Sequence, residues 1–187
     1  MDESQAMSLI GGALPAEGRA WADIGAGDGT FTRVLTERFG RACRVYAIDR
    51  DRRALARLER RAKQDGANVI TVAADLRQPF ELPGLDESML DGILLANALH
   101  FVPEAEVVLA RLVEWLRPGG RVVLVEYDRR GASRWVPHPI PIERLPRLAH
   151  AAHLLPPILT ETRPSAYGGN LYVATADRPA VHPAHAR

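Results

Sequence analysis

Short apolar runs rich in Val, Ile and Leu alternate along this chain with segments whose apolar residues recur at helical spacing. Continuous apolar runs are typical of strands buried on both faces of a parallel sheet, and the segments between them are typical of the helices that cover it. The pattern therefore predicts an α/β fold with helices between the strands. Strands are predicted at Ala20–Gly25, Arg44–Asp49, Asn68–Ala74, Leu90–Ala96, Gly120–Tyr127, Ile158–Arg163 and Asn170–Ala176.

The clearest helix lies at Asp51–Gln64, where Ala54, Leu55, Leu58 and Ala62 share one face and charged residues occupy the rest. Gly66 is placed to end it. A second helix is predicted in "EAEVVLARLVEWL", which follows Pro103 and ends at "RPGG". A short helix is predicted from Ile142 to Leu154.

The length of 187 residues suits one domain, which we assign to residues 1–176. Residues 129–155 are rich in Pro, Arg and His and are predicted to form an insertion on the substrate side of the sheet. The segment "PSAYGGN" suits a hairpin turn, so the last two strands are expected to run antiparallel. Residues 177–187 contain few apolar side chains and are predicted to form a flexible tail.

Charge and cysteine content narrow the partners and the setting. The 24 basic and 23 acidic residues give a net charge of +1, so no overall field attracts nucleic acid or a membrane surface. Cys43 is the single cysteine, which excludes an internal disulfide and favours a reducing, cytoplasmic setting. No apolar run has the length of a membrane span. A nucleic-acid partner is therefore unlikely, and a membrane is not expected.

The stretch "DIGAGDG" holds three glycines at alternate positions after the first predicted strand. Glycine lets a ligand approach the main chain, so Gly25, Gly27 and Gly29 indicate a ligand loop leading into a helix. A tight turn without a ligand is the alternative. The dinucleotide fingerprint needs a small residue three positions after its second glycine, where this chain has Thr30.

Polar residues also follow the next three predicted strands. Asp49 ends the second strand, where a carboxylate can accept hydrogen bonds from ribose hydroxyls; its alternative role is the N-cap of the following helix. Asp75 and Leu76 follow the third strand, from which they could contact the edge of an adenine ring, although Asp75 could be an ordinary loop acid. Asn97 follows the fourth strand. One ligand at this edge could contact all four strand ends.

These motifs together resemble the class I S-adenosylmethionine-dependent methyltransferases over about Leu14–Ala176. The resemblance rests on "DIGAGDG", "VYAIDRD", "VAADL" and "LRPGGRVVLVEY". It implies a Rossmann-like three-layer sandwich with a mainly parallel seven-stranded sheet and an antiparallel last strand. It also implies that S-adenosylmethionine is the cofactor and that S-adenosylhomocysteine is the product.

The resemblance assigns roles to particular residues. The main chain from Gly25 to Gly27, including Ala26, would contact the methionine part of the cofactor, with Asp23 orienting the loop. Gly29 would allow close packing of the following helix. Asp49 would hold the ribose, Arg50 would cover one face of the adenine in place of the usual apolar residue, Asp75 and Leu76 would contact the adenine edge, and Asn97 would lie near the amino acid group.

The methyl acceptor would lie beside these residues. His100 is a candidate general base at the same edge, and a packed histidine is the alternative. Trp135 and His138 are candidate substrate-binding residues, although a tryptophan there could simply anchor its loop. His150 and His153 could share a metal only with a third ligand that the sequence does not supply, so no metal is expected.

The expected function is in-line methyl transfer to a small molecule. The sequence lacks the patterns typical of enzymes that methylate nucleic-acid bases: "NALH" replaces the motif with two prolines, and Cys43 precedes the second strand. A nucleic-acid or protein methyltransferase, a nicotinamide oxidoreductase and a non-catalytic cofactor-binding module stay as alternatives. The acceptor and the oligomeric state are left open.

Overall fold

The computed structural model describes residues 1–85, 89–129, 131–165 and 169–180. Seven strands form one sheet in the order β3-β2-β1-β4-β5-β7-β6. The first five strands in this order pair in parallel, and β7 runs antiparallel to both β5 and β6, as the hairpin interpretation predicted. The strands are β1 (Ala20–Ile24), β2 (Arg44–Asp49), β3 (Val69–Ala73), β4 (Leu90–Ala96), β5 (Leu116–Asp128), β6 (Ile158–Pro164) and β7 (Asn170–Asp177).

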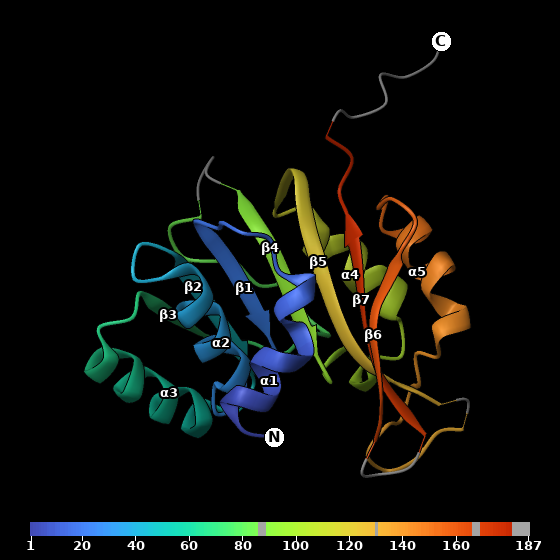
Figure 1. The fold of residues 1–187 in the computed structure, drawn as a ribbon, viewed down its shortest axis with the longest axis horizontal. Coiled ribbons are helices and arrows are strands. Elements are labelled where there is room, and N and C mark those ends of the chain that lie inside the picture. The colour runs from blue at the N-terminus through green and yellow to red at the C-terminus, as the bar shows by residue number, and fades with distance from the viewer. Residues whose placement is uncertain (86–88, 130, 166–168, 181–187) are drawn as a thin grey trace.

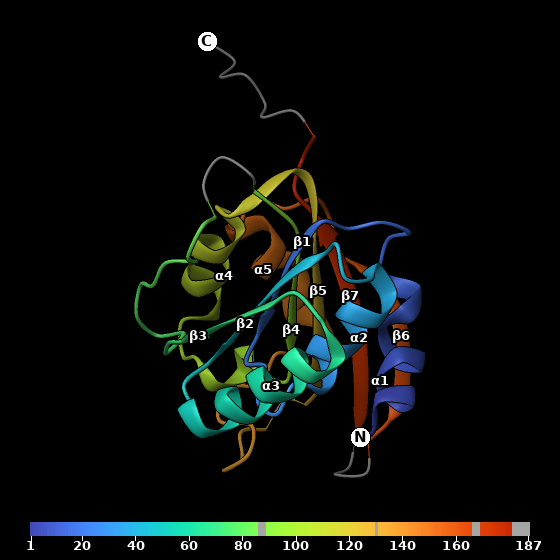
Figure 2. The ribbon, with the colours of Figure 1, turned by 90° about the vertical axis from the view of Figure 1, so that its left-hand side faces the viewer.

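Helices cover both faces of the sheet, which confirms the three-layer α/β prediction (Figure 1, Figure 2). On one side lie α1 (Glu3–Ile10), α2 (Thr30–Phe39) and α3 (Arg52–Asp65), and on the other α4 (Ala105–Val113) and α5 (Leu145–Ala151). Short 3₁₀ turns lie at η1 (Gly11–Ala13), η2 (Leu99–Phe101) and η3 (Ile142–Arg144).

Alternate residues of each central strand pack against opposite helix layers. Val45 contributes to the core under α1 and α2, whereas Tyr46 and Ile48 contribute to the core under α4 and α5. These side chains are buried on both faces, because the pleat of a strand points successive residues to opposite sides. This double burial explains why the strands appear in the sequence as continuous apolar runs.

The N-terminal helix α1 was not predicted. Asp2 caps it by accepting a hydrogen bond from the Gln5 backbone N–H at 2.8 Å, and the Gln5 side chain accepts one from the Asp2 N–H at 3.0 Å. This reciprocal capping box is readable in the first five residues. Glu3 also pairs with Arg33 of α2 at 2.5 Å. The helix therefore belongs to the packed domain.

The prediction of a helix between every pair of strands is wrong between β3 and β4. The described residues of that connection contain no helix. Instead Phe80 packs edge-on against Trp115, with ring centroids 5.0 Å apart, and the Tyr46 hydroxyl donates to the Pro83 carbonyl at 3.1 Å. Prolines at 79 and 83 disfavour a helix there, and the apolar side chains of the loop still cover the sheet.

The boundary between α4 and β5 also differs from the prediction. The helix ends at Val113 and the strand already begins at Leu116, so "RPGG" lies within β5 and does not end the helix. The register with β4 shifts between Leu90 and Gly92, which accommodates the extra residues as a bulge.

The predicted insertion and tail are placed as follows. Residues 142–151 form η3 and α5, and α5 packs beside α4. At the other end β7 continues to Asp177, whose carboxylate pairs with Arg121 at 2.7 Å. Arg178 remains attached through its backbone N–H to the Gly120 carbonyl at 2.8 Å. Residues 181–187 of the predicted tail, and 166–168 of the predicted turn, lie outside the described residues.

Candidate cofactor site

The glycine loop after β1 is fastened to the end of β2. The N–H groups of Gly25 and Ala26 both donate to the Ile48 carbonyl, at 2.8 and 2.9 Å, and the Gly27 N–H donates to Asp49 Oδ2 at 2.8 Å. Three successive donors are thus satisfied within the protein. A ligand at Gly25 or Gly27 would therefore meet carbonyl groups and bare Cα atoms, since these amides are already engaged.

Glycine is required at the three positions of the loop for different structural reasons. All have positive φ (79°, 52° and 86°), which side chains rarely adopt. A Cβ on Gly25 would lie 2.6 Å from the Cβ of Ala98, and one on Gly29 would lie 2.7 Å from Leu58 of α3. A Cβ on Gly27 would meet nothing within 4 Å and would project into open space. Only Gly27 combines a ligand-compatible conformation with free room above it.

Two acids at the end of β2 perform different tasks: Asp49 is the last residue of the strand, and Asp51 lies two residues beyond it. Asp51 is the N-cap of α3, accepting from the Arg53 and Ala54 N–H groups at 2.8 and 3.1 Å. Asp49 instead links the Gly27 loop to the Asp51 N–H, which donates to its Oδ1 at 2.8 Å. The N-cap alternative considered for Asp49 thus belongs to Asp51. Both oxygens of Asp49 still have lone-pair capacity for a ligand.

Asp75 and Arg77 form an ion pair in the wall beyond β3. The Arg77 guanidinium contacts both oxygens of Asp75, the shortest distance being 2.5 Å, and its backbone N–H donates to Asp75 Oδ1 at 3.0 Å. The Arg77 hydrogen bonds hold the pKa of Asp75 down at about 2. Arg111 of α4 donates to the Leu76 carbonyl at 2.5 Å and so fixes the same turn from below.

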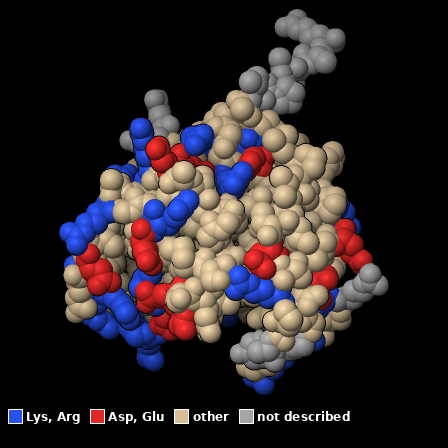
Figure 3. All heavy atoms as spheres, in the orientation of Figure 1, with Lys and Arg blue, Asp and Glu red and all other residues tan. Residues whose placement is uncertain are grey.

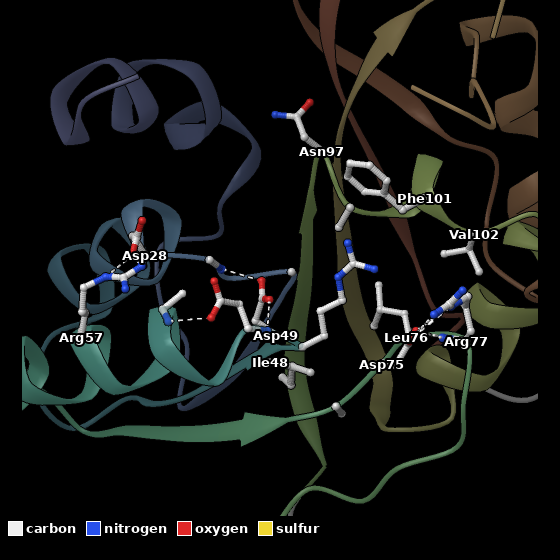
Figure 4. A pocket seen from close by; sticks show the side chains of 17 residues that line it. Asp28, Ile48, Asp49, Arg57, Asp75, Leu76, Arg77, Asn97, Phe101 and Val102 are labelled. Carbon is white, nitrogen blue, oxygen red and sulfur yellow. Dashed lines mark hydrogen bonds and ion pairs between the residues drawn. The ribbon is translucent and has the colours of Figure 1, made fainter. Parts of the chain in front are cut away.

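These elements surround a pocket of about 460 Å³ at the carboxyl edge of the parallel strands (Figure 4). Asp28 and Arg57, paired at 2.5 Å, lie on one side, and Asp75 and Arg77 lie on the other, with Asp49 between them. The residues lining it are Gly25, Gly27, Asp28, Ile48, Asp49, Arg50, Asp51, Ala54, Arg57, Ala74, Asp75, Leu76, Arg77, Asn97, Ala98, Phe101 and Val102. Its size and mixed lining suit a small-molecule site.

Most of the predicted cofactor residues come together in this pocket. The ones that line it are Gly25, Gly27, Asp49, Arg50, Asp75, Leu76 and Asn97. The other three predicted residues, Asp23, Ala26 and Gly29, do not line the pocket. Ala26 packs against Leu55 and Leu58 of α3, and Gly29 allows α3 to approach the loop. These three residues shape the loop without lining the pocket.

Asp23 is a buried acid below the loop, with 1% of its surface exposed. Its Oδ2 accepts a hydrogen bond from the Thr32 hydroxyl of α2 at 2.6 Å. Burial raises the pKa of the Asp23 carboxyl to about 7, and the Thr32 hydrogen bond offsets part of that rise. Asp23 therefore ties β1 to the start of α2 and acts on the loop from beneath.

Asn97 directly follows β4 in a strained backbone conformation, with φ at 53°. Its side-chain oxygen is buried and has no hydrogen-bond partner among the residues that the structure describes. Unpaired buried acceptors are rare, because each costs free energy unless a donor satisfies it. Since Asn97 also lines the pocket, a donor group of a bound ligand would resolve this cost.

His100 lies three residues further on, but its ring is buried below the pocket wall and is not among the lining residues. Its side chain is 2% exposed, and Nδ1 lies 2.6 Å from Glu126 Oε2 on β5. The sequence did not indicate Glu126 as a partner, because the two residues are 26 positions apart. The role of His100 as a base stays a prediction.

The predicted substrate residues lie in the segment after β5. The His138 N–H donates to the His100 carbonyl at 3.0 Å, so this segment lies against the η2 turn. Trp135 is 74% exposed, with the Arg134 guanidinium 5.5 Å from its ring centroid, and neither Trp135 nor His138 lines the pocket. Trp135 is not a core anchor. Across the described ranges, no three His, Cys, Asp or Glu side chains gather as a metal site.

Sequence reasoning named Arg50 but missed Arg57, Arg77 and the apolar side of the pocket. Arg57 is one turn into α3 and Arg77 is two residues past Asp75, so each was within reach of a pocket acid. Phe101 and Val102 follow the Asn97 motif directly and could have been found from that position. Their contribution to the pocket depends on the η2 turn, which the sequence pattern did not indicate.

The fold and the pocket at its carboxyl edge define a Rossmann-like α/β protein built to bind a nucleoside-containing ligand. Comparison with known proteins agrees, because the family described as "Methyltransferase domain" matches residues 22–120. The chain belongs to this methyltransferase domain family.

Curated relatives include an uncharacterized methyltransferase of Mycobacterium tuberculosis (strain ATCC 25618 / H37Rv), 35% identical over 123 residues, which cover 66% of this chain and 46% of the relative. The biotin biosynthesis bifunctional protein BioCD of Bordetella avium is 31% identical over 134 residues, covering 71% of this chain and 27% of that protein. The chain thus spans less than half the length of these relatives.

Solved structures confirm the fold. The 1,6-didemethyltoxoflavin-N1-methyltransferase of Burkholderia thailandensis, crystallised with 1,6-didemethyltoxoflavin and S-adenosylhomocysteine, aligns with a TM-score of 0.74 at 24% identity over 95% of this chain and 78% of that chain. The [4+2]-cyclase SpnF aligns with the same TM-score at 16% identity, over 96% of this chain and 82% of that one. Similar folds thus occur in proteins with different chemistry.

Proposed function

We propose that this chain is an S-adenosylmethionine-dependent methyltransferase that transfers a methyl group in line to a small molecule. The observation that carries the proposal is the pocket itself, which is lined by Gly27 with open space beside its Cα, by the carboxylate of Asp49 and by Asn97, whose side-chain oxygen is unpaired among the described residues. These three features match an amino acid group at one end of a ligand and a ribose in its middle.

The residues present fit the cofactor. The buried Asn97 oxygen lacks a donor that an ammonium group could supply, and Gly27 leaves the main chain bare on the pocket side. Asp49 would accept from ribose hydroxyls, while Arg50 would stack on the adenine, whose edge would contact Asp75 and Leu76. When bound, the cofactor supplies an electrophilic methyl group on a sulfonium.

The protein contributes alignment and exclusion of water. Phe101 and Val102 form the apolar side of the pocket next to Asn97, where the acceptor would lie. Holding the acceptor in line in a site without water lowers the barrier by itself. We assign the acceptor to the edge formed by η2 and the segment carrying Trp135 and His138, which meet at the hydrogen bond between His138 and His100.

A small-molecule acceptor fits the surface better than a polyanion. On the face shown in Figure 3, acidic and basic side chains are interleaved. The arginines of the pocket are largely paired with acids, as with Arg57 and Asp28. A nucleic-acid substrate would need a continuous basic area to contact its phosphates. The described helices include none long and apolar enough to cross a membrane, and a cytoplasmic enzyme is part of this proposal.

Radiolabel transfer tests the acceptor class. The protein is incubated with S-adenosyl-L-[methyl-¹⁴C]methionine and a bacterial extract, and the products are separated by a 3-kDa filter. The proposal expects label in the low-mass fraction, and much less of it from the Asp49→Ala variant at a cofactor concentration that does not saturate the variant. Label confined to protein or nucleic acid would overturn the small-molecule assignment.

A further inference from the structure

A buried acid–base pair lies beside the pocket and is not used by the cofactor site. Glu126 near the end of β5 is 0% exposed, and His100 in η2 is 2% exposed. The carboxylate receives two hydrogen bonds from one residue: the His100 backbone N–H reaches Oε1 at 3.1 Å, and ring Nδ1 lies 2.6 Å from Oε2.

This arrangement fixes the tautomer of the imidazole. A backbone N–H can only donate, so Glu126 Oε1 must accept from it. If Oε2 accepts as well, the single N–H proton of a neutral imidazole lies on Nδ1. Nε2 then carries a free lone pair and points away from Glu126. Burying a carboxylate costs far more free energy than burying an amide, so a glutamine would suffice at this position if its role were only structural.

The pair is also placed at the acceptor end of the site. Asn97 and Phe101, on either side of His100 in the same short segment, both line the pocket. The Phe101 ring centroid lies 4.3 Å from that of His100, and the Tyr127 centroid lies 6.1 Å away. Phe101 is 48% exposed and Tyr127 is only partly buried. Phe101, which contacts the imidazole and lines the pocket, thus connects His100 to the site.

We propose that His100 is the general base of this enzyme and that Glu126 is its positioning residue, so that the acceptor is a compound whose reacting atom bears a proton, such as a hydroxyl group or an activated C–H. This inference rests on the proposed methyl transfer. Nε2 takes the proton, the electron pair of the former X–H bond forms the new bond to carbon, and the donor sulfur keeps the pair of the bond that breaks. The imidazolium so formed is stabilised by Glu126.

Several titratable groups surround the pair. Tyr127 lies beside the imidazole, and His138 contacts it through the backbone. Tyr172 of β7 lies near Glu126 and Asp128, and burial raises the pKa of its hydroxyl well above the ordinary value. Its hydroxyl donates to the Ile140 carbonyl at 2.7 Å, so Tyr172 is engaged elsewhere.

The tautomer can be tested without any substrate. Nitrogen-15 NMR of the histidine side chains in the intact protein is expected to show His100 with a proton on Nδ1 and none on Nε2, the resonance being assigned by its loss in His100→Asn. In Glu126→Gln the amide oxygen can still accept from the His100 backbone N–H, but the amide NH₂ can only donate. Nδ1 must then accept this hydrogen bond, and the ring proton is expected to move to Nε2. Glu37→Gln, an exposed site on α2, serves as the matched control. A proton on Nε2 in the wild type would overturn the proposal.

Two further readouts separate this inference from the proposed function. Calorimetric titration with S-adenosylhomocysteine is expected to give the same affinity for wild type and Glu126→Gln within about twofold. Absence of binding to the wild type would overturn methyl transfer while leaving the tautomer result intact.

With a panel of phenols, 1,3-dicarbonyl compounds, thioethers and tertiary amines, label transfer to the proton-bearing acceptors is expected to fall about a hundredfold in Glu126→Gln. Transfer only to thioethers or tertiary amines, unchanged by the substitution, would overturn the acceptor class.

Discussion

Replacing Asp49 with alanine tests the cofactor pocket at its centre. In the structure each oxygen of the Asp49 carboxylate accepts one backbone N–H at 2.8 Å, from Gly27 and from Asp51. Each oxygen retains a further acceptor position directed to the ligand. The substitution therefore removes the proposed bonds to the ribose and also loosens the loop that supports the methionine end.

The expected loss follows from the charge on the acceptor. A hydrogen bond to an ionised group contributes about 1.5 to 3 kcal/mol, and every 1.4 kcal/mol corresponds to a tenfold change in affinity. Asp49→Ala is therefore expected to weaken S-adenosylhomocysteine binding by about 10- to 150-fold in isothermal titration calorimetry. The core strands do not depend on this side chain, so the circular dichroism spectrum is expected to stay that of the folded protein.

A matched control removes the same charge away from the site. Asp65 lies at the exposed end of α3, and Asp65→Ala is expected to leave the affinity unchanged. If Asp49→Ala, folded, bound S-adenosylhomocysteine as tightly as the wild type, Asp49 would not be a ribose ligand and the assignment of the pocket would fail.

Three other substitutions test the glycine loop, the buried acid Asp23 and the ion pair between Glu106 of α4 and Arg144 of η3. Gly27→Val is expected to abolish S-adenosylhomocysteine binding, because the side chain fills the ligand space. Gly84 also has positive φ, and a Cβ added there would meet nothing within 4 Å, so the control Gly84→Val should retain binding. Equal calorimetric affinities of the two variants would show the loop to be a simple turn. The folded pKa of Asp23, about 7, lies above its unfolded value, so its charge costs stability as pH rises from about 4 to 7. Asp23→Asn should therefore gain up to about 4 kcal/mol over the wild type across that window in urea unfolding, and parallel curves would contradict this. The Arg144 hydrogen bonds lower the pKa of Glu106 to about 2, so the pair stabilises the fold above about pH 4.5 and its contribution is lost as pH falls toward 2. Glu106→Gln should cost about 1 to 3 kcal/mol at pH 7 and little at pH 2.5; an equal loss at both values would count against the ion pair.

The central sheet could be predicted from the sequence because burial on both faces leaves an unmistakable pattern. Strands such as β2 and β4 have no exposed face, so the central residues of each, Val45–Ile48 and Ile93–Ala96, form an apolar run with polar residues at or just beyond its ends. The connection between β3 and β4 could not be predicted in the same way. Its apolar residues contact the sheet one at a time from a loop, and no periodicity records such contacts.

The site was predictable where it depends on the ends of strands. Asp49, Asp75 and Asn97 each follow a strand of the parallel sheet, so topology alone brings them to one edge. The pairing of Asp75 with Arg77, and of His100 with Glu126, depends on side-chain direction and on burial. Those are properties of the packed molecule, which a single sequence does not display.

A comparison of how the protein binds three adenosine-containing ligands tests the central claim most directly. The wild-type protein is titrated in separate calorimetric experiments with S-adenosylhomocysteine, NAD and NADP under identical conditions. We predict saturable, one-to-one binding of S-adenosylhomocysteine that Asp49→Ala weakens, and no measurable binding of either nicotinamide dinucleotide. If NAD or NADP bound and S-adenosylhomocysteine did not, the assignment of the pocket to S-adenosylmethionine would be contradicted.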